Sequence, residues 1–334
     1  MYLLVTDSSF NYLPEKLQNY RNNNSVVFDE FTPNPLYEQV LEGVKMYKDN
    51  NCDEIIAIGG GSTIDVAKCI KLFVTLDPSI NYLKQEFKEN NIKLTAIPTT
   101  AGTGSEATKY AVIYYEGKKQ SVTHESIIPS NVIFEPDVLK TLPMYQKKAT
   151  MLDALSHNIE SYWSVNSTDE SKNYSKQALE LILNNYDNYL KADETTFPLM
   201  QQAAFLAGKA INITQTTAGH AMCYKLTSLY KIAHGQACAM CVNKLYPFML
   251  DNIDKCIDSR GIDYLRNIFN ELTNIISPNK FNEIYNSMNF DRIEYSDLDI
   301  NILVESVNLD RLKNNPIKLD KQDLDKLYRE VLGE

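Results

Sequence analysis

Three of the four histidines in the chain, together with one aspartate, have the types and spacing of ligands for a single metal ion. Asp153 and His157 lie four residues apart in a segment without Gly or Pro, so both side chains leave one face of a predicted helix. His220 and His234 stand at the two ends of a segment long enough for a helix and a turn that brings the second imidazole back toward the first. One carboxylate and three neutral imidazoles suit a divalent first-row ion such as Fe²⁺, Zn²⁺, Mn²⁺ or Co²⁺. Each histidine alone fits an ordinary side chain with satisfied hydrogen bonds, and only the joint spacing favours a metal site.

Two polar loops that contain glycine follow predicted strands. The strand over 55–58 runs into Gly59-Gly60-Gly61-Ser62 and then into a helix, where free N–H groups and the helix dipole favour a diphosphate. The spacing is not GxGxxG, so the common dinucleotide fingerprint is absent, and the turn could equally be only a tight connection. A second loop, over 98–106, follows the strand over 94–97, and α/β sheets bind cofactors at such strand ends. The two loops together predict a cofactor site.

These loops belong to an alternation of strands and helices. Strands are predicted at 3–6 and 25–28, and a helix from about 35 to 49 leads into the strand at 55–58, a pattern that indicates βαβ units and a mostly parallel sheet. A hairpin is predicted from segments 110–115 and 120–123, with its turn over 116–119. The sequence therefore predicts an α/β dinucleotide-binding domain with a Rossmann-like parallel sheet over residues 1–146.

Helical periodicity dominates the second part of the chain. Segments with apolar residues at helical spacing are predicted at about 148–164, 168–191, 197–211, 215–229, 235–251, 258–276, 279–287 and 321–332. Residues 147–334 are therefore predicted to form an all-α domain that carries the metal ligands and faces the cofactor domain.

Length, charge and cysteine content narrow the class of protein. A chain of 334 residues exceeds what one core usually supports, which favours two domains. The net charge of −10 argues against a nucleic-acid or anionic-membrane partner and favours a small-molecule substrate. Six cysteines are too few for a disulfide scaffold, and no secretory signal is evident, so we expect the reducing cytoplasm. No apolar run approaches the length of a membrane span. The CxxC at 238–241 has no second pair and is interpreted as helix core.

Four motifs in order resemble those of the iron-containing (group III) alcohol dehydrogenases. They are Gly-Gly-Gly-Ser-x-x-Asp-x-Ala-Lys at 59–68, the loop at 98–106, Asp-Ala-Leu-x-His-x-Ile-Glu at 153–160, and a His followed 14 residues later by His-Gly. The resemblance implies a dehydroquinate synthase-like fold, in which a dinucleotide-binding domain packs on a helical domain. It further implies that Asp153, His157, His220 and His234 hold the metal ion, with Fe²⁺ expected and Zn²⁺ as the alternative. A homodimer is also expected.

The resemblance assigns cofactor positions as well. Those implied to contact the dinucleotide are Asp7, Asn34, Gly60, Gly61, Ser62, Asp65, Thr99, Thr100, Thr103 and Lys119. Asp7 ends the first strand where this family meets the adenosine ribose, and a carboxylate there accepts from a 2′-hydroxyl and repels a 2′-phosphate. NAD(H) is therefore predicted over NADP(H). The alternative for Asp7 is a helix N-cap or turn residue.

Tyr224 marks a departure from the family pattern. Many members have another His four residues after the third ligand, where this chain has Tyr224. A phenol can donate a proton but is a poor general base near neutral pH unless its pKa is lowered. We predict that Tyr224 is the catalytic proton donor, with water or a ribose hydroxyl as the alternative.

The substrate is predicted from further segments that resemble the phosphonoacetaldehyde reductase branch, which makes 2-hydroxyethylphosphonate. The segments are 121–126, 146–151, 162–168 and 213–217. A phosphonate needs cationic or N–H-rich recognition. The candidates are Lys147, Lys148, Lys225 and Arg311, each of which could also be a solvated surface charge. His124 is either a donor to the ligand or a polar loop residue.

Three functions follow as hypotheses. The first is an NADH-dependent reductase of phosphonoacetaldehyde, and the second is the same chemistry on simple alcohols or diols such as butanol or 1,3-propanediol. The third is a lyase resembling dehydroquinate synthase, which shares the fold. Such a lyase is expected to carry one Glu and two His ligands and a more basic pocket, so the Asp153 set argues against it.

Overall fold

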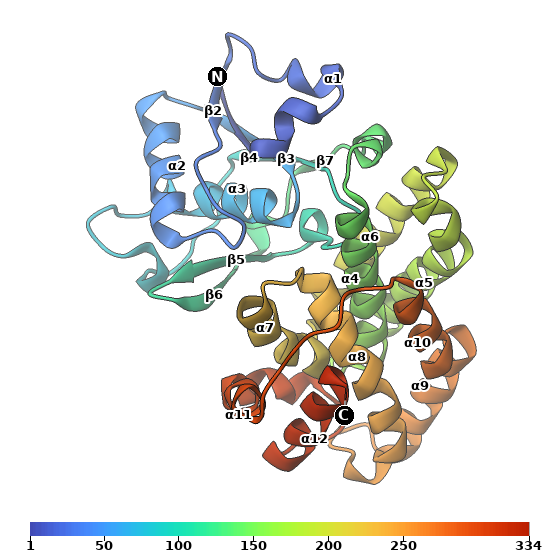
Figure 1. Cartoon of the computed structure of the whole chain (residues 1–334). Helices are drawn as coiled ribbons and strands as arrows, with labels where there is room; N and C mark the ends of the chain where they lie inside the picture. The colour runs from blue at the N-terminus through green and yellow to red at the C-terminus, as the bar shows by residue number, and fades with distance from the viewer. Residues whose placement is uncertain (334) are drawn as a thin grey trace.

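A five-stranded parallel sheet forms the N-terminal part of the computed structural model, which describes residues 1–333 apart from the side chain of residue 310. The strands are β1 (Tyr2–Thr6), β2 (Ser25–Phe28), β3 (Glu54–Gly59), β4 (Lys93–Pro98) and β7 (Asn131–Val132), in the order β2-β1-β3-β4-β7. Figure 1 shows this part of the chain above the helices that follow it in the sequence. The predicted parallel sheet is confirmed. The edge strand β7 was not predicted, because two residues are too short to carry a hydrophobic pattern.

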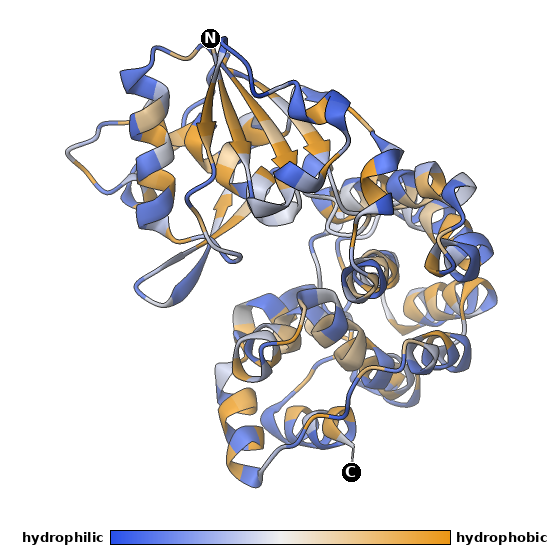
Figure 2. Cartoon of the chain, turned by 45° about the horizontal axis from the view of Figure 1, so that its top comes forward, coloured by the Kyte–Doolittle hydropathy of each residue, from blue (hydrophilic) through white to orange (hydrophobic). Residues whose placement is uncertain are grey.

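Both faces of the sheet are buried, so its strands are nearly continuous apolar runs (Figure 2). Leu3 and Val5 pack in a cluster with the helices α2 (Tyr37–Asp49) and α3 (Gly61–Phe73). Tyr2 and Leu4 point to the opposite face and join a larger cluster that continues into the helical part of the chain. One face of the sheet therefore shares an apolar core with the helical part, while the other face packs on α2 and α3.

The strand order reverses at β1, which pairs with β2 on one side and β3 on the other. Thr6 is paired with Ile58, so the carboxyl ends of β1 and β3 lie side by side. Ligands of open α/β sheets bind at such a switch point. The predicted cofactor segments around Asp7 and Gly60 begin at these two strand ends.

A separate antiparallel hairpin, β5 (Tyr110–Tyr115) and β6 (Lys118–Thr123), was predicted with a four-residue turn. That turn was wrong in length. Glu116 and Gly117 alone form it, with φ of 50° and 71°, as a two-residue hairpin loop requires. Lys119 is therefore a strand residue paired with Tyr114.

Helices make up the second part of the chain, as predicted. They are α4 (Met144–Trp163), α5 (Asp169–Leu190), α6 (Phe197–Thr214), α7 (Ala218–Tyr230), α8 (His234–Asp251), α9 (Ile262–Ile275), α10 (Pro278–Ser287), α11 (Asp297–Ser306) and α12 (Lys321–Leu332). Helix α11 was not predicted. Leu298 and Ile302 in it are exposed, so its apolar residues do not form a single stripe. In the described part of the chain, no helix has the length and hydrophobicity needed to traverse a bilayer.

The loop after β4 packs closely against α6. Gly104 has a φ of 62°, and a Cβ there would lie 2.5 Å from Cα of Gly208. Only glycine permits both this backbone conformation and this approach. The contact holds the predicted cofactor loop against the helical part of the molecule.

Candidate metal and cofactor site

The four predicted metal ligands meet at Oδ1 of Asp153. The Nε2 atom of His220 lies 3.6 Å from this oxygen, that of His234 lies 3.9 Å away, and that of His157 lies 4.0 Å away. Asp153 and His157 project from one face of α4, whereas the other two imidazoles come from α7 and α8. Asp153 Oδ1 is buried and has no hydrogen-bond partner within the described residues.

The protonation of this group suits a divalent cation. Burial alone would raise the pKa of Asp153, but the adjacent imidazoles hold it well below its usual range, so the carboxylate is ionised. Burial lowers the pKa of His157 to about 4, so this imidazole is neutral. A buried carboxylate oxygen without a hydrogen-bond donor, faced by three imidazole nitrogens, is a donor set that fits such an ion. Occupation by metal stays a prediction.

Helix α8 begins at His234 and reaches the site because the next residue has no side chain. A Cβ at Gly235 would lie 2.8 Å from Cβ of Asp153 and would overlap the carbonyl oxygen of Ala149. A larger residue would push α8 away from α4. Gly235 therefore sets the distance between the two helices that carry these ligands.

Glu160, buried in α4, supports His220 from behind. Its Oε2 contacts Nδ1 of His220, while its Oε1 accepts from Thr217 Oγ1 at 2.6 Å and from Gly219 N at 2.7 Å. Burial lowers the pKa of His220, but Glu160 and Asp153 together raise it to about 10, so a metal ion would bind Nε2 in exchange for a proton. Glu160 ends the motif at 153–160, which alone does not predict a role for it. Its position seven residues after Asp153, on the same helical face, was the signal.

Two buried cysteines also approach the histidines. Asp153, His220 and Cys238 form a group whose potential ligand atoms lie within 4.8 Å of one another. However, Cys238 Sγ lies 3.2 Å from Nδ1 of His220 and 3.5 Å from Nε2, so it sits nearer the ring nitrogen that Glu160 contacts. Cys223 Sγ similarly lies 3.6 Å from Nδ1 of His234. The three Nε2 atoms face Asp153 instead, and this favours the set of one aspartate and three histidines.

A cavity of about 520 Å³ joins this group to the sheet. Predicted residues that line it are Asp153, His157, His220, His234, Tyr224, Asn34, Gly61, Ser62, Asp65, Thr103 and Lys119. Four other predicted cofactor residues, Asp7, Gly60, Thr99 and Thr100, lie outside its described wall. The cavity therefore brings the candidate metal ligands and most of the candidate cofactor residues to one space.

The two predicted cofactor loops contact each other. A Cβ on Gly61 would lie 2.9 Å from the side chain of Thr103, and one on Gly60 would lie 3.5 Å from that of Thr100. Thr99 N donates to the carbonyl of Gly59 at 3.0 Å, which ties the ends of β4 and β3 together. The loops thus form one surface, as their placement after neighbouring strands predicts.

Lys68 is a buried residue next to these loops, and its motif does not by itself predict a role for it. Its Nζ donates to Ser105 Oγ at 3.0 Å, to Thr108 Oγ1 at 3.0 Å and to the carbonyl of Tyr110 at 2.8 Å. Asp65 accepts from the same Ser105 hydroxyl at 2.6 Å. Lys68 and Asp65 therefore link helix α3 to the loop after β4.

Asp7 occupies the end of β1 and is engaged on both oxygens. Oδ1 accepts from Ser9 N at 2.9 Å and caps the 3-10 helix η1 (Ser8–Tyr12), while Oδ2 accepts from Thr63 Oγ1 at 2.8 Å. The capping alternative is therefore present in the structure. Since Thr63 belongs to the first turn of α3, Asp7 also lies beside the Gly-rich turn, and contact with a ribose stays a prediction.

Tyr224 lies on the cavity wall next to a candidate ligand. Its ring is nearly parallel to that of His234, with centroids 5.7 Å apart, and its hydroxyl oxygen accepts from Arg311 Nη1 at 3.2 Å. Lys119 Nζ lies 3.2 Å from the centroid of the same ring. Burial raises the pKa of Tyr224 well above its ordinary value. Its role in proton transfer stays a prediction.

The remaining cations proposed for a phosphonate lie elsewhere, apart from Arg311, which lines the cavity. Lys147 is buried with Nζ 4.9 Å from the ring centroid of Phe197, and Lys148 Nζ donates to the carbonyl of Met288 at 2.7 Å. Lys225 is not part of the described cavity wall. His124 caps a short 3-10 helix through Ser126 N.

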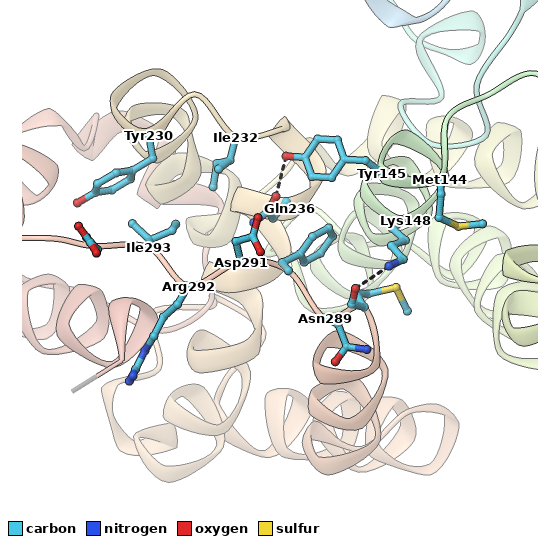
Figure 3. A pocket seen from close by; sticks show the side chains of 13 residues that line it. Met144, Tyr145, Lys148, Tyr230, Ile232, Gln236, Asn289, Asp291, Arg292 and Ile293 are labelled. Atoms are coloured by element: carbon cyan, nitrogen blue, oxygen red, sulfur yellow. Dashed lines mark hydrogen bonds between the residues drawn. The ribbon is translucent and has the colours of Figure 1, made fainter.

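A second cavity, of about 620 Å³, is bordered by Tyr230, Ile232 and Gln236, at and beside the segment between α7 and α8 (Figure 3). Ile232 faces it, while His234 faces the first cavity. Tyr145 fixes this segment: its hydroxyl accepts from Ala233 N at 2.8 Å and donates to Gln236 Oε1 at 2.7 Å. The backbone that carries His234 is therefore held by a side chain from outside the candidate site.

Two family descriptions match the chain. The family model described as iron-containing alcohol dehydrogenase matches residues 1–136. The model for the C-terminal part of the Fe-containing alcohol dehydrogenase family matches residues 147–332. Together these matches span both the sheet and the helical part.

Relatives of several activities are similar to the chain. NAD-dependent methanol dehydrogenase of Bacillus methanolicus is 35% identical over 216 residues, which are 63% of this chain and 56% of the relative. Phosphonoacetaldehyde reductase of Streptomyces viridochromogenes is 29% identical over 303 residues, 83% of this chain and 76% of the relative. Sulfoacetaldehyde reductase from Bifidobacterium kashiwanohense in complex with NAD+ has the same fold, with a TM-score of 0.86 at 24% identity over 99% of this chain and 91% of that one. The alignment spans little more than half the length of the methanol dehydrogenase.

Proposed function

The chain belongs to the iron-containing alcohol dehydrogenase family, and from that premise we propose that it is a metal-dependent, NAD(H)-linked aldehyde reductase and alcohol dehydrogenase. The observation that carries the proposal is the convergence of three Nε2 atoms on Asp153 Oδ1, in the same cavity as the predicted cofactor residues Gly61 and Thr103. A metal site without a cofactor site beside it would not favour hydride transfer, and neither would a cofactor site without a metal site.

Asp153, His157, His220 and His234 would hold the ion. When bound, the ion supplies Lewis acidity toward the aldehyde oxygen, and the nicotinamide supplies the hydride. The protein's part is to hold the substrate between the histidines and the loops after β3 and β4. Three of the four candidate ligand side chains are almost fully buried, which limits water at the reacting atoms.

Tyr224 is proposed to donate the proton that the product alcohol needs. Burial raises the pKa of Tyr224, so the phenol is protonated at neutral pH. It can therefore donate a proton but cannot act as a general base. The hydroxyl oxygen accepts a hydrogen bond from Arg311, which leaves the O–H of Tyr224 available to donate in the cavity that it lines. A water molecule or a ribose hydroxyl is the alternative donor.

The preference for NAD(H) over NADP(H) is proposed from Asp7, which lies at the switch point of the sheet. Its carboxylate would accept from a ribose 2′-hydroxyl and repel a 2′-phosphate. Fe²⁺ is proposed as the native ion, with Zn²⁺ as the alternative. A homodimer in the cytoplasm remains a prediction from the sequence.

Phosphonoacetaldehyde is the proposed substrate and 2-hydroxyethylphosphonate the proposed product. Support comes from the phosphonoacetaldehyde reductase that aligns over 83% of the chain, and from Arg311 in the cavity wall. The second candidate is a simple alcohol, which the 35% identity to a methanol dehydrogenase favours. The dehydroquinate synthase-like lyase is disfavoured by the grouping of one aspartate with three histidines.

The test is NADH oxidation by protein reconstituted with Fe²⁺ or Zn²⁺, with phosphonoacetaldehyde beside propionaldehyde and butanal. The proposal predicts metal-dependent oxidation that is fastest with phosphonoacetaldehyde. Equal or better rates with the simple aldehydes would move the function to the second candidate. No oxidation with any aldehyde would contradict both. A His234→Ala variant should lose bound metal, and retention of full metal content would refute the ligand assignment.

A further inference from the structure

Two cationic side chains enter the cavity beside the candidate metal ligands. Lys119 comes from β6, and Arg311 comes from the 3-10 helix η8 (Leu309–Asn314). Lys119 Nζ lies 3.2 Å from the ring centroid of Tyr224, and the guanidinium carbon of Arg311 lies 5.2 Å from the same centroid. One aromatic ring therefore contacts both cations.

Neither cation meets a carboxylate within ion-pair distance among the described side chains. The hydrogen bond that Arg311 does make goes to the neutral hydroxyl of Tyr224, which leaves most of its five N–H donors for another partner. Burial lowers the pKa of Lys119 to about 7, and the adjacent Arg311 lowers it as well. Asp65 and Asp153 line the same cavity and raise the pKa of Lys119, but neither forms an ion pair with it, so a bound anion would stabilise the two cationic groups further.

The position of Lys119 and Arg311 relative to the metal ligands indicates which bound molecule would carry the anion. The ring of Tyr224 stacks on that of His234 with centroids 5.7 Å apart, so the ring that contacts both cations also contacts a candidate metal ligand. Asp153 and Arg311 line the same cavity, so an aldehyde whose oxygen points toward Asp153 would have its other end in the space that Arg311 borders. The predicted diphosphate positions Gly61 and Ser62 lie in the first turn of α3, on a different element from Arg311.

We propose that Arg311, with the positive charge of Lys119 beside it, binds an oxyanion substituent of the aldehyde substrate. A guanidinium matches the planar, two-oxygen edge of a phosphonate, sulfonate or carboxylate. The inference rests on the proposed function, since it concerns the substrate of that same cavity. Of the four cations that the sequence offers as phosphonate-binding candidates, this inference selects Arg311.

The test compares Arg311→Met with the wild-type protein, both reconstituted with metal and assayed with NADH. The ratio of kcat/KM for phosphonoacetaldehyde to that for propionaldehyde should fall by roughly tenfold to hundredfold, through a higher KM for the charged aldehyde. Arg311→Lys should recover part of the ratio. Lys313→Met removes the same charge from an exposed neighbour on η8 and should leave the ratio unchanged. Sulfoacetaldehyde and succinic semialdehyde, assayed in parallel, identify which oxyanion is preferred.

A binding measurement separates this inference from the proposed function. Calorimetric titration of the metal-loaded protein with 2-hydroxyethylphosphonate, beside 1-propanol, needs no turnover. Wild-type protein that reduces no aldehyde would contradict the proposed function, while the comparison of phosphonate binding by wild type and Arg311→Met would still decide the role of Arg311. Unchanged phosphonate binding in that variant, or equal losses for charged and neutral aldehydes, would overturn the inference.

Discussion

The carboxylate of Glu160 contacts Nδ1 of His220, while Nε2 on the other side of the ring lies 3.6 Å from Oδ1 of Asp153. This arrangement holds the Nδ1 proton toward Glu160, so a metal ion would bind Nε2 in place of its proton. Such a carboxylate behind a histidine orients the ring and raises its basicity as a ligand.

Replacement of Glu160 by Gln should therefore weaken metal binding. The amide keeps the size of the side chain but loses the negative charge that holds Nδ1–H, so we expect the metal dissociation constant to rise by about tenfold to hundredfold. Competition with a chromophoric chelator measures it. Glu180→Gln, an exposed change on α5, is the control. Equal metal affinity in the two variants would show that Glu160 has no part in the site.

Tyr145 is expected to position His234 through the backbone of Ala233. Tyr145→Phe removes the hydroxyl that accepts from Ala233 N and donates to Gln236, while the ring keeps its edge contact with Phe290. We expect a several-fold loss of metal affinity and an altered visible spectrum of the Co²⁺-loaded protein. Phe290→Leu, which disturbs the ring contact and leaves the hydroxyl, should not change the spectrum. A spectrum of Tyr145→Phe identical to wild type would contradict the role.

Asp7→Ser should relax the choice of dinucleotide. A serine can still cap η1 by accepting from Ser9 N but no longer repels a 2′-phosphate. The ratio of kcat/KM for NADPH to that for NADH should rise at least tenfold, chiefly through a lower KM for NADPH. Asp29→Ser, an exposed change just after β2, serves as the comparison. If both variants keep the wild-type ratio, Asp7 does not determine the choice between NADH and NADPH.

Glu106 should make stability depend on pH. Burial raises its pKa to about 7 from an unfolded value near 4.5. The folded state then binds more protons than the unfolded state between these values, so stability should fall as pH rises from about 4.5 to 7. In Glu106→Gln this part of the fall should vanish, and the variant should gain Tm relative to wild type at pH 7.5 but not at pH 4.5. Parallel Tm curves for the two proteins would exclude the effect.

Sequence spacing within a single helix or strand predicted those parts of the site whose residues all lie on that one element. The four-residue spacing of Asp153 and His157 places them on one face of α4, and the strand at 54–59 leads into the Gly-rich turn as its apolar run indicates. The partners of Glu160 could not be predicted, because Thr217 and Gly219 reach it only when α7 packs against α4. Such contacts depend on tertiary packing, which no local period encodes.

The same limit applied to the hairpin and to the cations. The length of the hairpin turn follows from positive φ angles at Glu116 and Gly117. Because the turn is only two residues long, Lys119 belongs to the strand and lies beside Tyr224. Four cations looked equivalent in the sequence. Only the course of the chain after α11 brings Arg311 to the cavity.

The buried Lys68 has a consequence for how the dinucleotide associates. Its three hydrogen bonds hold Ser105, Thr108 and Tyr110 in place as part of the folded structure. Ordering a free loop costs about 1–2 kcal/mol of backbone entropy per residue, and here folding has already met that cost. Cofactor affinity is then not diminished by loop ordering, and the entropy of association should carry only a small unfavourable contribution from the protein backbone.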